Sequence, residues 1–346
     1  MKIFLGLAFC AVTATAQGQA MERLFYYVDR EDSYNSLVKH IDQISIVAPQ
    51  VYVVDSLGIM WGQLDKRVVD LAKKHNVKVM PLFTNEGFNQ PALRKLLADT
   101  VAQRRSIASM VDLCKSQGYW GLQFDVENVN INDRDRFTKW YTDASNALHS
   151  VGCKISIAVV HRTEEGAGPT SYGRFMQDSW RGGYDFAAIA KASDIVSLMT
   201  YSEHTRRTTP GPIAGLTWTR QALDYALQFI PAEKLSLGIP TYGGRWFTRG
   251  DASADRASTT SESVNWKWGS GFAERHGAQI RWDSTEAVPY AYYSVGGVNE
   301  WLFLEDVRSF KAKLDLGKAS RVRGFSVWVL GPEDERIWDL LAKEPR

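Results

Sequence analysis

The sequence has few cysteines, no cluster of metal ligands and no hydrophobic run long enough to cross a membrane. Its 346 residues include three cysteines and six scattered histidines, none of them at the spacing of a zinc site. Lys and Arg number 41 against 39 Asp and Glu, for a formal net charge of +2. This balance excludes the strongly charged surfaces typical of proteins that bind nucleic acids or anionic membranes. We therefore expect no metal, no cofactor, no nucleic-acid partner and no membrane span.

Residues 1–20 have the pattern of a signal peptide, which predicts a secreted or periplasmic protein. Lys2 is followed by an apolar run over residues 3–12, and small residues then offer cleavage after Ala16 or after Ala20. The apolar run is too short to span a bilayer. We expect the mature chain to begin near residue 21.

The mature chain keeps two cysteines, Cys114 and Cys153. Both fall just before predicted strands, and so toward the same end of a barrel. In an oxidising compartment they are compatible with a disulfide or with two buried free thiols.

Eight apolar, β-branched runs predict eight strands, and amphipathic segments between them predict helices. The predicted strands are Leu24–Val28, Ile44–Val54 with a break at Pro49, Val77–Phe83, Gly121–Asp125, Lys154–Val160, Ile195–Tyr201, Leu235–Pro240 and Gly324–Val329. The predicted helices are Leu64–His75, Asp99–Gln117, Asp133–Val151, Phe186–Ala192, Thr217–Phe229, Leu304–Gly317 and Ile337–Lys343. The alternation favours an α/β fold, a (β/α)8 TIM barrel. An open doubly wound sheet is the alternative, but the sequence lacks the glycine-rich turn that such a fold would be expected to have after its first strand.

Residues 242–303 interrupt this alternation. They are rich in Gly, Ser, Thr, Trp and Tyr, with alternating stretches such as Gln279–Trp282 and Ala291–Val295. We interpret them as a small α+β insertion after the seventh strand, within one catalytic barrel spanning residues 21–346. The insertion would either wall one side of a cleft or be a surface excursion without function.

The fourth predicted strand is the most informative part of the chain. With period 2, one face carries an apolar set and the other an amide and two carboxylates: Leu122, Phe124 and Val126 against Gln123, Asp125 and Glu127. In an antiparallel sheet the polar face would simply meet water. Inside a barrel it has no bulk water, and buried carboxylates without partners are costly. Because active sites of such barrels lie at the carboxyl ends of the strands, Asp125 and Glu127 are predicted to be catalytic.

Other strand ends bring polar and aromatic residues to the same place. Met199 and Tyr201 close the sixth strand, Trp328 lies on the eighth, Tyr242 follows the seventh and Asn85 follows the third. Each alone is more typical of a core or turn position. Together they predict a pocket, and aromatic rings are suited to cover the apolar faces of sugars.

These strand ends together resemble glycoside hydrolase family 18, the family of chitinases and endo-β-N-acetylglucosaminidases. Its fourth strand carries Asp-x-x-Asp-x-Asp-x-Glu, which here is the window 120–127. Asp125 and Glu127 match the last two acids, whereas Trp120 and Gln123 replace the first two. An amide at the second position is similar to the spore-cortex and peptidoglycan branch of the family.

Three further motifs follow in the family's order. They are Met-x-Tyr at 199–201, Gly-x-Pro-x-Tyr-Gly at 238–243, and a Gly-x-x-x-Trp-x-Leu-Gly-x-Glu-Asp ending over residues 324–334. The matches run from about residue 24 to residue 340, nearly the whole mature chain. The ending is again similar to the peptidoglycan branch.

The resemblance implies retaining hydrolysis in which the substrate's own 2-acetamido group attacks the anomeric carbon. By the family pattern, Glu127 is the general acid and then the base, and Asp125 orients the acetamide and stabilises its positive charge. Tyr201 would donate a hydrogen bond to the acetamide oxygen. The other expected substrate-binding residues are Trp328, Gln123, Tyr242, Met199 and Asn85. Gln123 cannot share a proton with Asp125, as an acid there would, but it can donate a hydrogen bond to it.

We expect a monomeric hydrolase of β-1,4-linked N-acetylglucosamine glycans, with peptidoglycan favoured over chitin or an N-glycan. A non-catalytic lectin on the same barrel is the first alternative, because fold does not fix function. A hydrolase that uses the same two acids on a glycan without acetamido groups is the second.

Overall fold

The computed structural model describes residues 20–249 and 260–345. The predicted signal peptide therefore lies outside the described residues, apart from Ala20. The strands are β1 Glu22–Tyr27, β2 Ile46–Val54, β3 Met60–Trp61, β4 Lys78–Val79, β5 Leu82–Asn85, β6 Gly121–Asp125, β7 Lys154–Val160, β8 Ile195–Met199, β9 Leu235–Pro240, β10 Gly243–Arg249, β11 Thr260–Val264, β12 Arg281–Asp283, β13 Val288–Val295, β14 Val298–Phe303 and β15 Gly324–Trp328. The α-helices are α1 Glu31–His40, α2 Lys66–Lys74, α3 Gln90–Ala98, α4 Thr100–Gln117, α5 Arg134–Ser150, α6 Ser171–Met176, α7 Phe186–Ala192, α8 Leu216–Ala226, α9 Trp266–Arg275, α10 Val307–Ala319 and α11 Arg336–Leu341. Short 3-10 turns occur at Ile41–Gln43, Glu86–Phe88, Ile131–Asp133 and Ala232–Lys234, and a π-helical turn at Gln177–Arg181.

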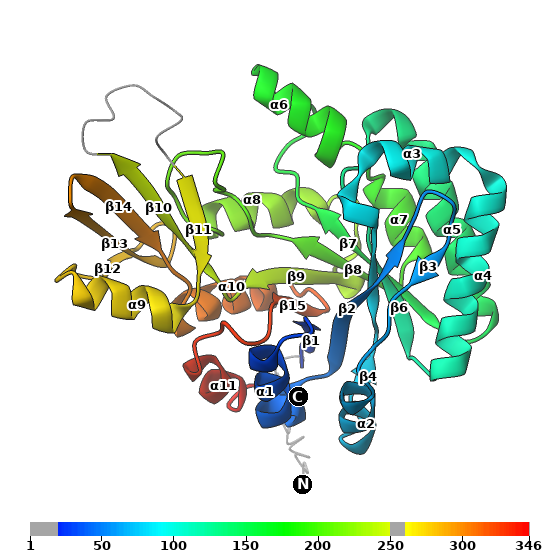
Figure 1. Cartoon of the computed structure of the whole chain (residues 1–346), viewed down its shortest axis with the longest axis horizontal. Helices are drawn as coiled ribbons and strands as arrows, with labels where there is room; N and C mark the ends of the chain where they lie inside the picture. The colour runs from blue at the N-terminus through cyan, green and yellow to red at the C-terminus, as the bar shows by residue number, and fades with distance from the viewer. Residues whose placement is uncertain (1–19, 250–259, 346) are drawn as a thin grey trace, which may run out of the picture.

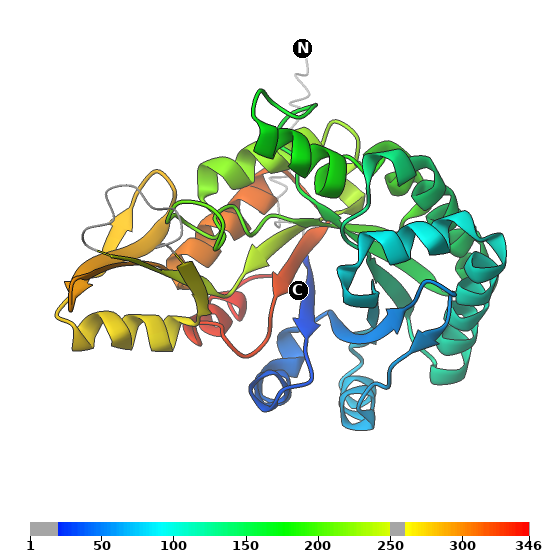
Figure 2. The same cartoon turned by 45° about the horizontal axis from the view of Figure 1, so that its top comes forward.

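Parallel strands close into a barrel that confirms the predicted (β/α)8 fold. The order is β1-β15-β9-β8-β7-β6-β5-β2, and β2 pairs with β1 to close the ring. Leu24 of β1 thus lies opposite Ser326 of β15 on one side and Ile46 of β2 on the other. The crossover helices lie outside the ring, as Figures 1 and 2 show for α3, α4, α5 and α7.

Three details of the predicted strands are wrong. Pro49 does not break the second strand, because it stands next to a register shift between Gln50 and Tyr52, a place where a sheet tolerates proline. The third strand is instead divided, into β4 and β5, with Pro81 in the gap. The sixth strand ends at Met199, so Tyr201 lies two residues beyond it.

The two faces of the barrel strands bury different side chains. Outward-facing residues such as Phe25, Phe83 and Phe124 join the large core beneath the helices. The interior is apolar on one side, where Leu24, Tyr26, Ile46, Ala48, Met80, Leu82 and Ile195 cluster. The opposite side is filled by Gln123 and by serines of the four strands that follow it.

The insertion after β9 is a separate layer beside the barrel. Its five strands form an antiparallel sheet in the order β11-β10-β14-β13-β12. Helix α9 packs on this sheet through a small core that includes Ala273, Ala291 and Leu302. Figure 1 shows this unit to one side of the barrel, next to α10. It confirms the predicted α+β insertion, while the predicted domain limits stay a prediction.

Cys114 and Cys153 form a disulfide, which decides between the two states that the sequence left open. It joins the last turn of α4 to the residue before β7, with 6.5 Å between the two Cα atoms. Both cysteines are buried. Within the described residues, no helix combines the length and the apolarity that a bilayer span requires.

Replacing both cysteines by serine should lower the free energy of unfolding by about 2–4 kcal/mol, because the bond closes a loop of 39 residues in the unfolded chain. Urea unfolding of the mature protein, oxidised and reduced, measures this difference. Equal midpoints for the oxidised protein and the double variant would contradict it.

Candidate active site

The carboxyl ends of the barrel strands surround a cavity of about 230 Å³. Six of the eight predicted site residues line it: Asp125, Glu127, Met199, Tyr201, Tyr242 and Trp328. They come from the ends of four strands, β6, β8, β9 and β15, as the parallel topology requires. Tyr26, Gln50, Phe88, Ala158 and Ser202 complete the wall and were not predicted.

Gln123 lies below the cavity, inside the barrel. Its amide nitrogen donates hydrogen bonds to the hydroxyls of Ser156 and Ser197, at 2.8 and 3.2 Å. Ser197 continues through Ser326 to Ser236, with oxygen–oxygen distances of 2.9 and 2.6 Å. The expected hydrogen bond from Gln123 to Asp125 is therefore replaced by bonds to this serine chain.

Asn85 lies behind Glu127 rather than in the wall of the cavity. Its side-chain oxygen accepts a hydrogen bond from the Glu127 backbone N–H at 3.0 Å, and its amide nitrogen donates to the Glu127 carbonyl at 3.1 Å. These two hydrogen bonds fix the backbone of Glu127 and link the carboxyl ends of the neighbouring strands β5 and β6.

The surroundings of Asp125 and Glu127 disfavour the ionised forms of both carboxyl groups. Burial raises the pKa of Asp125 well above its usual value, and the charge of Glu127 raises it further. Burial also raises the pKa of Glu127, while a hydrogen bond from Trp180 opposes this rise. Like charges so close resist double ionisation, so the pair favours holding one proton.

Trp180 donates a hydrogen bond to one oxygen of Glu127, a contact that was not predicted. Its indole Nε1 donates to Glu127 Oε2 at 3.1 Å. The ring packs edge-on against His161, whose Nδ1–H donates to the Met199 carbonyl at 3.0 Å. Burial and the charge of Arg181 lower the pKa of His161 to about 3, so the imidazole is neutral here. The other Glu127 oxygen is left for the cavity.

Tyr201 and Trp328 are positioned by the motif at 238–243. A Cβ on Gly238 would come within 2.4 Å of the Leu198 carbonyl and 3.1 Å of the Tyr201 ring, so only glycine lets Tyr201 lie there. The Thr241 backbone N–H donates to the Trp328 carbonyl at 2.9 Å, and its hydroxyl donates to the Val329 carbonyl at 2.7 Å. Tyr26 packs against the Trp328 ring with centroids 5.3 Å apart.

Backbone strain is concentrated around the cavity. Six described residues other than glycine have positive φ, and three of them border the site: Phe88 at 50°, Asn128 at 58° and Ser202 at 64°. Such conformations cost energy and persist where the surroundings enforce them, which is typical of functional sites.

The described residues contain no group of three or more His, Cys, Asp or Glu that could hold a metal ion. A TIM barrel with two interacting carboxyls and aromatic walls at the carboxyl ends of its strands is an arrangement suited to glycoside cleavage.

Comparison with known proteins identifies the class and the family. A profile described as "Glycosyl hydrolases family 18" matches residues 5–333. The chain is 26% identical over 317 residues to the uncharacterized glycosylase YvbX of Bacillus subtilis, covering 90% of this chain and 88% of that protein. It is 28% identical to the cortical fragment-lytic enzyme of the same species, covering 79% of this chain but 62% of that protein. A chitinase from Chromobacterium violaceum superimposes with a TM-score of 0.83 at 25% identity, over 94% of this chain and 98% of that one.

The protein is thus a glycoside hydrolase, of a class that acts on polymers containing N-acetylglucosamine. The chain belongs to glycosyl hydrolase family 18.

Trp180→Phe should raise the pKa of Glu127 further, because the indole N–H stabilises the ionised carboxylate. Carbon-13 NMR titration of labelled Glu carboxyls measures this shift, with Trp268→Phe on the exposed part of α9 as the matched control. An unchanged or lower pKa in the first variant would contradict the expected role of this hydrogen bond.

Glu127→Gln should stabilise the fold increasingly as the pH rises. The folded-state pKa of Glu127 is raised above its unfolded value, so the parent loses stability as the pH climbs from about 4 through the folded pKa. Glutamine carries no such penalty. Urea midpoints at pH 4, 6 and 8 test this, with Glu233→Gln on an exposed turn as the control. A difference in urea midpoint between Glu127→Gln and the parent that does not grow with pH would contradict this prediction.

Proposed function

We propose that this protein is an exported hydrolase that cleaves peptidoglycan-type glycans by a retaining, substrate-assisted mechanism. The observation that carries the proposal is the position of the carboxyls in the cavity wall, where Glu127 has one oxygen bound by Trp180 and Asp125 lies beside it. The family supports an N-acetylglucosamine-containing substrate.

Asp125 would receive the N–H of the substrate's 2-acetamido group. A hydrogen bond donated to a carboxylate favours its ionised form, so substrate binding moves the shared proton of the pair toward Glu127. Glu127 then protonates the leaving oxygen while the acetamide oxygen attacks the anomeric carbon from the other face. The ionised Asp125 stabilises the positive charge on the resulting ring intermediate.

Water completes the reaction with Glu127 acting as the base. Once Glu127 has lost its proton, the Trp180 N–H stabilises the carboxylate until it takes a proton from the attacking water. The Tyr201 hydroxyl, which has no hydrogen-bond partner among the described residues, would donate to the acetamide oxygen. Trp328 would form the floor beneath the sugar ring, with Met199 and Tyr242 on the walls.

Gln123 and Asn85 would support this machinery from outside the cavity wall. Gln123 ties the strand below Asp125 to Ser156 and Ser197, without adding a charge. Asn85 fixes the backbone of Glu127. Both residues therefore act on the substrate through the two carboxyls.

Two observations support peptidoglycan as the substrate and export as the destination. One relative is named as a cortical fragment-lytic enzyme, and its matched part spans most of this chain. A buried disulfide is typical of proteins in oxidising compartments and agrees with the predicted signal peptide. Chitin-like oligosaccharides share the same acetamido chemistry and remain the second substrate class.

Glu127→Gln should lower kcat by about 10²–10⁴-fold with binding retained, because the amide cannot transfer the proton. Mass spectrometry of N-acetylglucosamine oligomers and purified peptidoglycan, incubated with mature protein, would detect the new reducing ends. Glu233→Gln controls for the substitution itself, and a glycan with 2-hydroxyl in place of the acetamide should resist cleavage.

Products that persist in Glu127→Gln would overturn the assignment of the acid. No products from the folded parent, with binding retained, would instead support the lectin alternative. Cleavage of the 2-hydroxyl glycan would exclude the acetamide as the nucleophile.

A further inference from the structure

A second cavity, of about 220 Å³, adjoins the catalytic cavity. It lies between the loop that follows β8 and the insertion strands β10 and β11, and it shares Ser202 and Tyr242 with the catalytic cavity. Its other walls include Arg206, Ile213, Trp246, Ser261 and Ser263. Because the two cavities share these two residues, they lie side by side.

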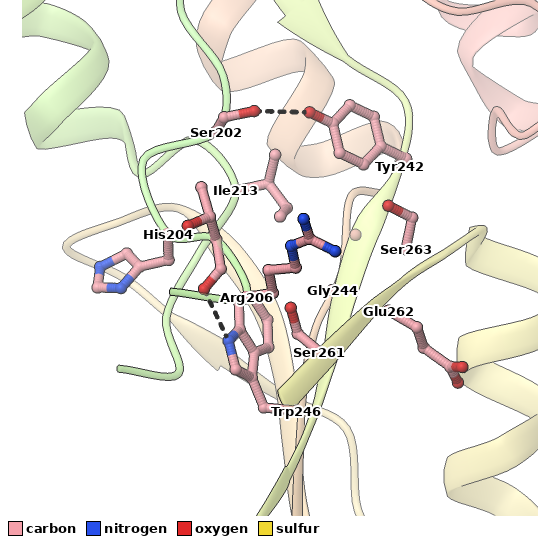
Figure 3. A pocket seen from close by; sticks show the side chains of 12 residues that line it. Ser202, His204, Arg206, Ile213, Tyr242, Gly244, Trp246, Ser261, Glu262 and Ser263 are labelled. Atoms are coloured by element: carbon pink, nitrogen blue, oxygen red, sulfur yellow. Dashed lines mark hydrogen bonds between the residues drawn. The ribbon is translucent and has the colours of Figure 1, made fainter. Parts of the chain in front are cut away.

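Arg206 brings a positive charge into this second cavity. Figure 3 shows its side chain directed inward, on the same side as Ile213 and Tyr242. Among the described residues, its guanidinium makes no hydrogen bond or ion pair. A guanidinium presents a rigid fork of donors that matches a carboxylate in two parallel hydrogen bonds.

The acidic residues nearby are already engaged elsewhere. Glu262, which also lines the cavity, pairs with Arg245 at 3.0 Å and points away from the centre. Glu203 accepts a hydrogen bond from the Gly215 N–H at 2.7 Å. No described carboxylate therefore neutralises Arg206.

The loop that carries Arg206 is held in place from the insertion. Trp246 of β10 is buried and donates its indole N–H to the Thr205 carbonyl at 3.4 Å, a contact drawn in Figure 3. The Thr208 hydroxyl accepts from the Thr205 N–H at 2.9 Å. The residue before Arg206 is thus fixed on both its N–H and its carbonyl.

We infer that Arg206 forms a subsite for a carboxylate on the sugar next to the one that is cleaved. The inference rests on the proposed function and names the neighbouring residue of the same glycan. Peptidoglycan alternates N-acetylglucosamine with muramic acid, whose lactyl ether carries a carboxyl group, whereas chitin carries none. The carboxylate can be the free lactyl group of a peptide-free strand or a carboxylate of an attached peptide.

Steady-state kcat/KM for three substrates tests this subsite. The substrates are peptide-free peptidoglycan strands, the same strands with their carboxyls converted to methylamides, and peptide-bearing strands. The parent should prefer a carboxylate-bearing strand over the amidated one by about 10–100-fold. Arg206→Met should bring that ratio close to one, and Arg206→Lys should restore part of it. Arg207→Met, at the neighbouring arginine that is exposed like Arg206 but does not line the cavity, should leave the ratio unchanged.

Of the two carboxylate-bearing strands, the one with the higher kcat/KM in the parent identifies the source of the carboxylate. The inference fails if the parent shows no preference, or if Arg206→Met lowers all three kcat/KM values equally. If the parent cleaves none of the strands, the proposed function fails, and calorimetry on Glu127→Gln still tests the subsite. A binding preference that Arg206→Met abolishes in that background would support the subsite, and equal binding of charged and amidated strands would overturn it.

Discussion

The closure of parallel strands into a ring is the constraint on which the rest of this molecule depends. Side chains that point inward have no bulk water, so each polar one must find a partner inside the ring or reach its mouth. The amide nitrogen of Gln123 and the hydroxyls of Ser156, Ser197, Ser236 and Ser326 meet this demand by bonding to one another, between neighbouring strands and across the ring interior. Asp125 and Glu127, one and two steps further along the same strand face, have no such partners below them and face the cavity instead. Closure of the strands into a ring therefore accounts both for the cavity and for the carboxyl oxygens that have no partner within the barrel.

The position of Glu127 is set before any substrate arrives. Asn85 fixes its backbone from the neighbouring strand, and Trp180 fixes one oxygen from the π-helical turn after α6. His161 supports both sides of the site, since it contacts the Trp180 ring and bonds to the Met199 carbonyl. The imidazole is neutral here. A positive charge at this position would lower the pKa of the neighbouring carboxyls and so favour loss of the proton that the pair holds.

The alternation of eight apolar runs with amphipathic segments was enough to predict the barrel, because buried parallel strands and the helices that cover them differ clearly in their hydrophobic pattern. The parity of side chains along the strands located the residues that line the cavity from β6, β8 and β15. It could not predict Trp180 or Phe88, since residues of the connections between strands carry no period and their approach to the site depends on tertiary packing. The disulfide stayed open for a similar reason: its two cysteines are 39 residues apart, and only the packing of α4 beside β7 brings their Cα atoms to 6.5 Å. Pro49 misled because its tolerance depends on a register shift that no local signal reports.

The acidic residues in the family motifs divide into two groups by how many hydrogen-bond and ion-pair partners their carboxyl groups have. Glu333 accepts hydrogen bonds from Ser36 and from the Gly331 N–H, which ties the end of β15 to α1. Asp334 accepts from the Val307 N–H at 2.9 Å and pairs with Arg336, which ties the same segment to the start of α10. These two acids have partners and hold the last strand against its neighbouring helices. Asp125 and Glu127 retain oxygens that face an open cavity, at a pKa raised by burial, and such groups gain most from a ligand that donates a hydrogen bond or accepts a proton. A shared motif therefore does not by itself identify a catalytic acid; the acid that its own fold leaves unsatisfied is the one available for chemistry.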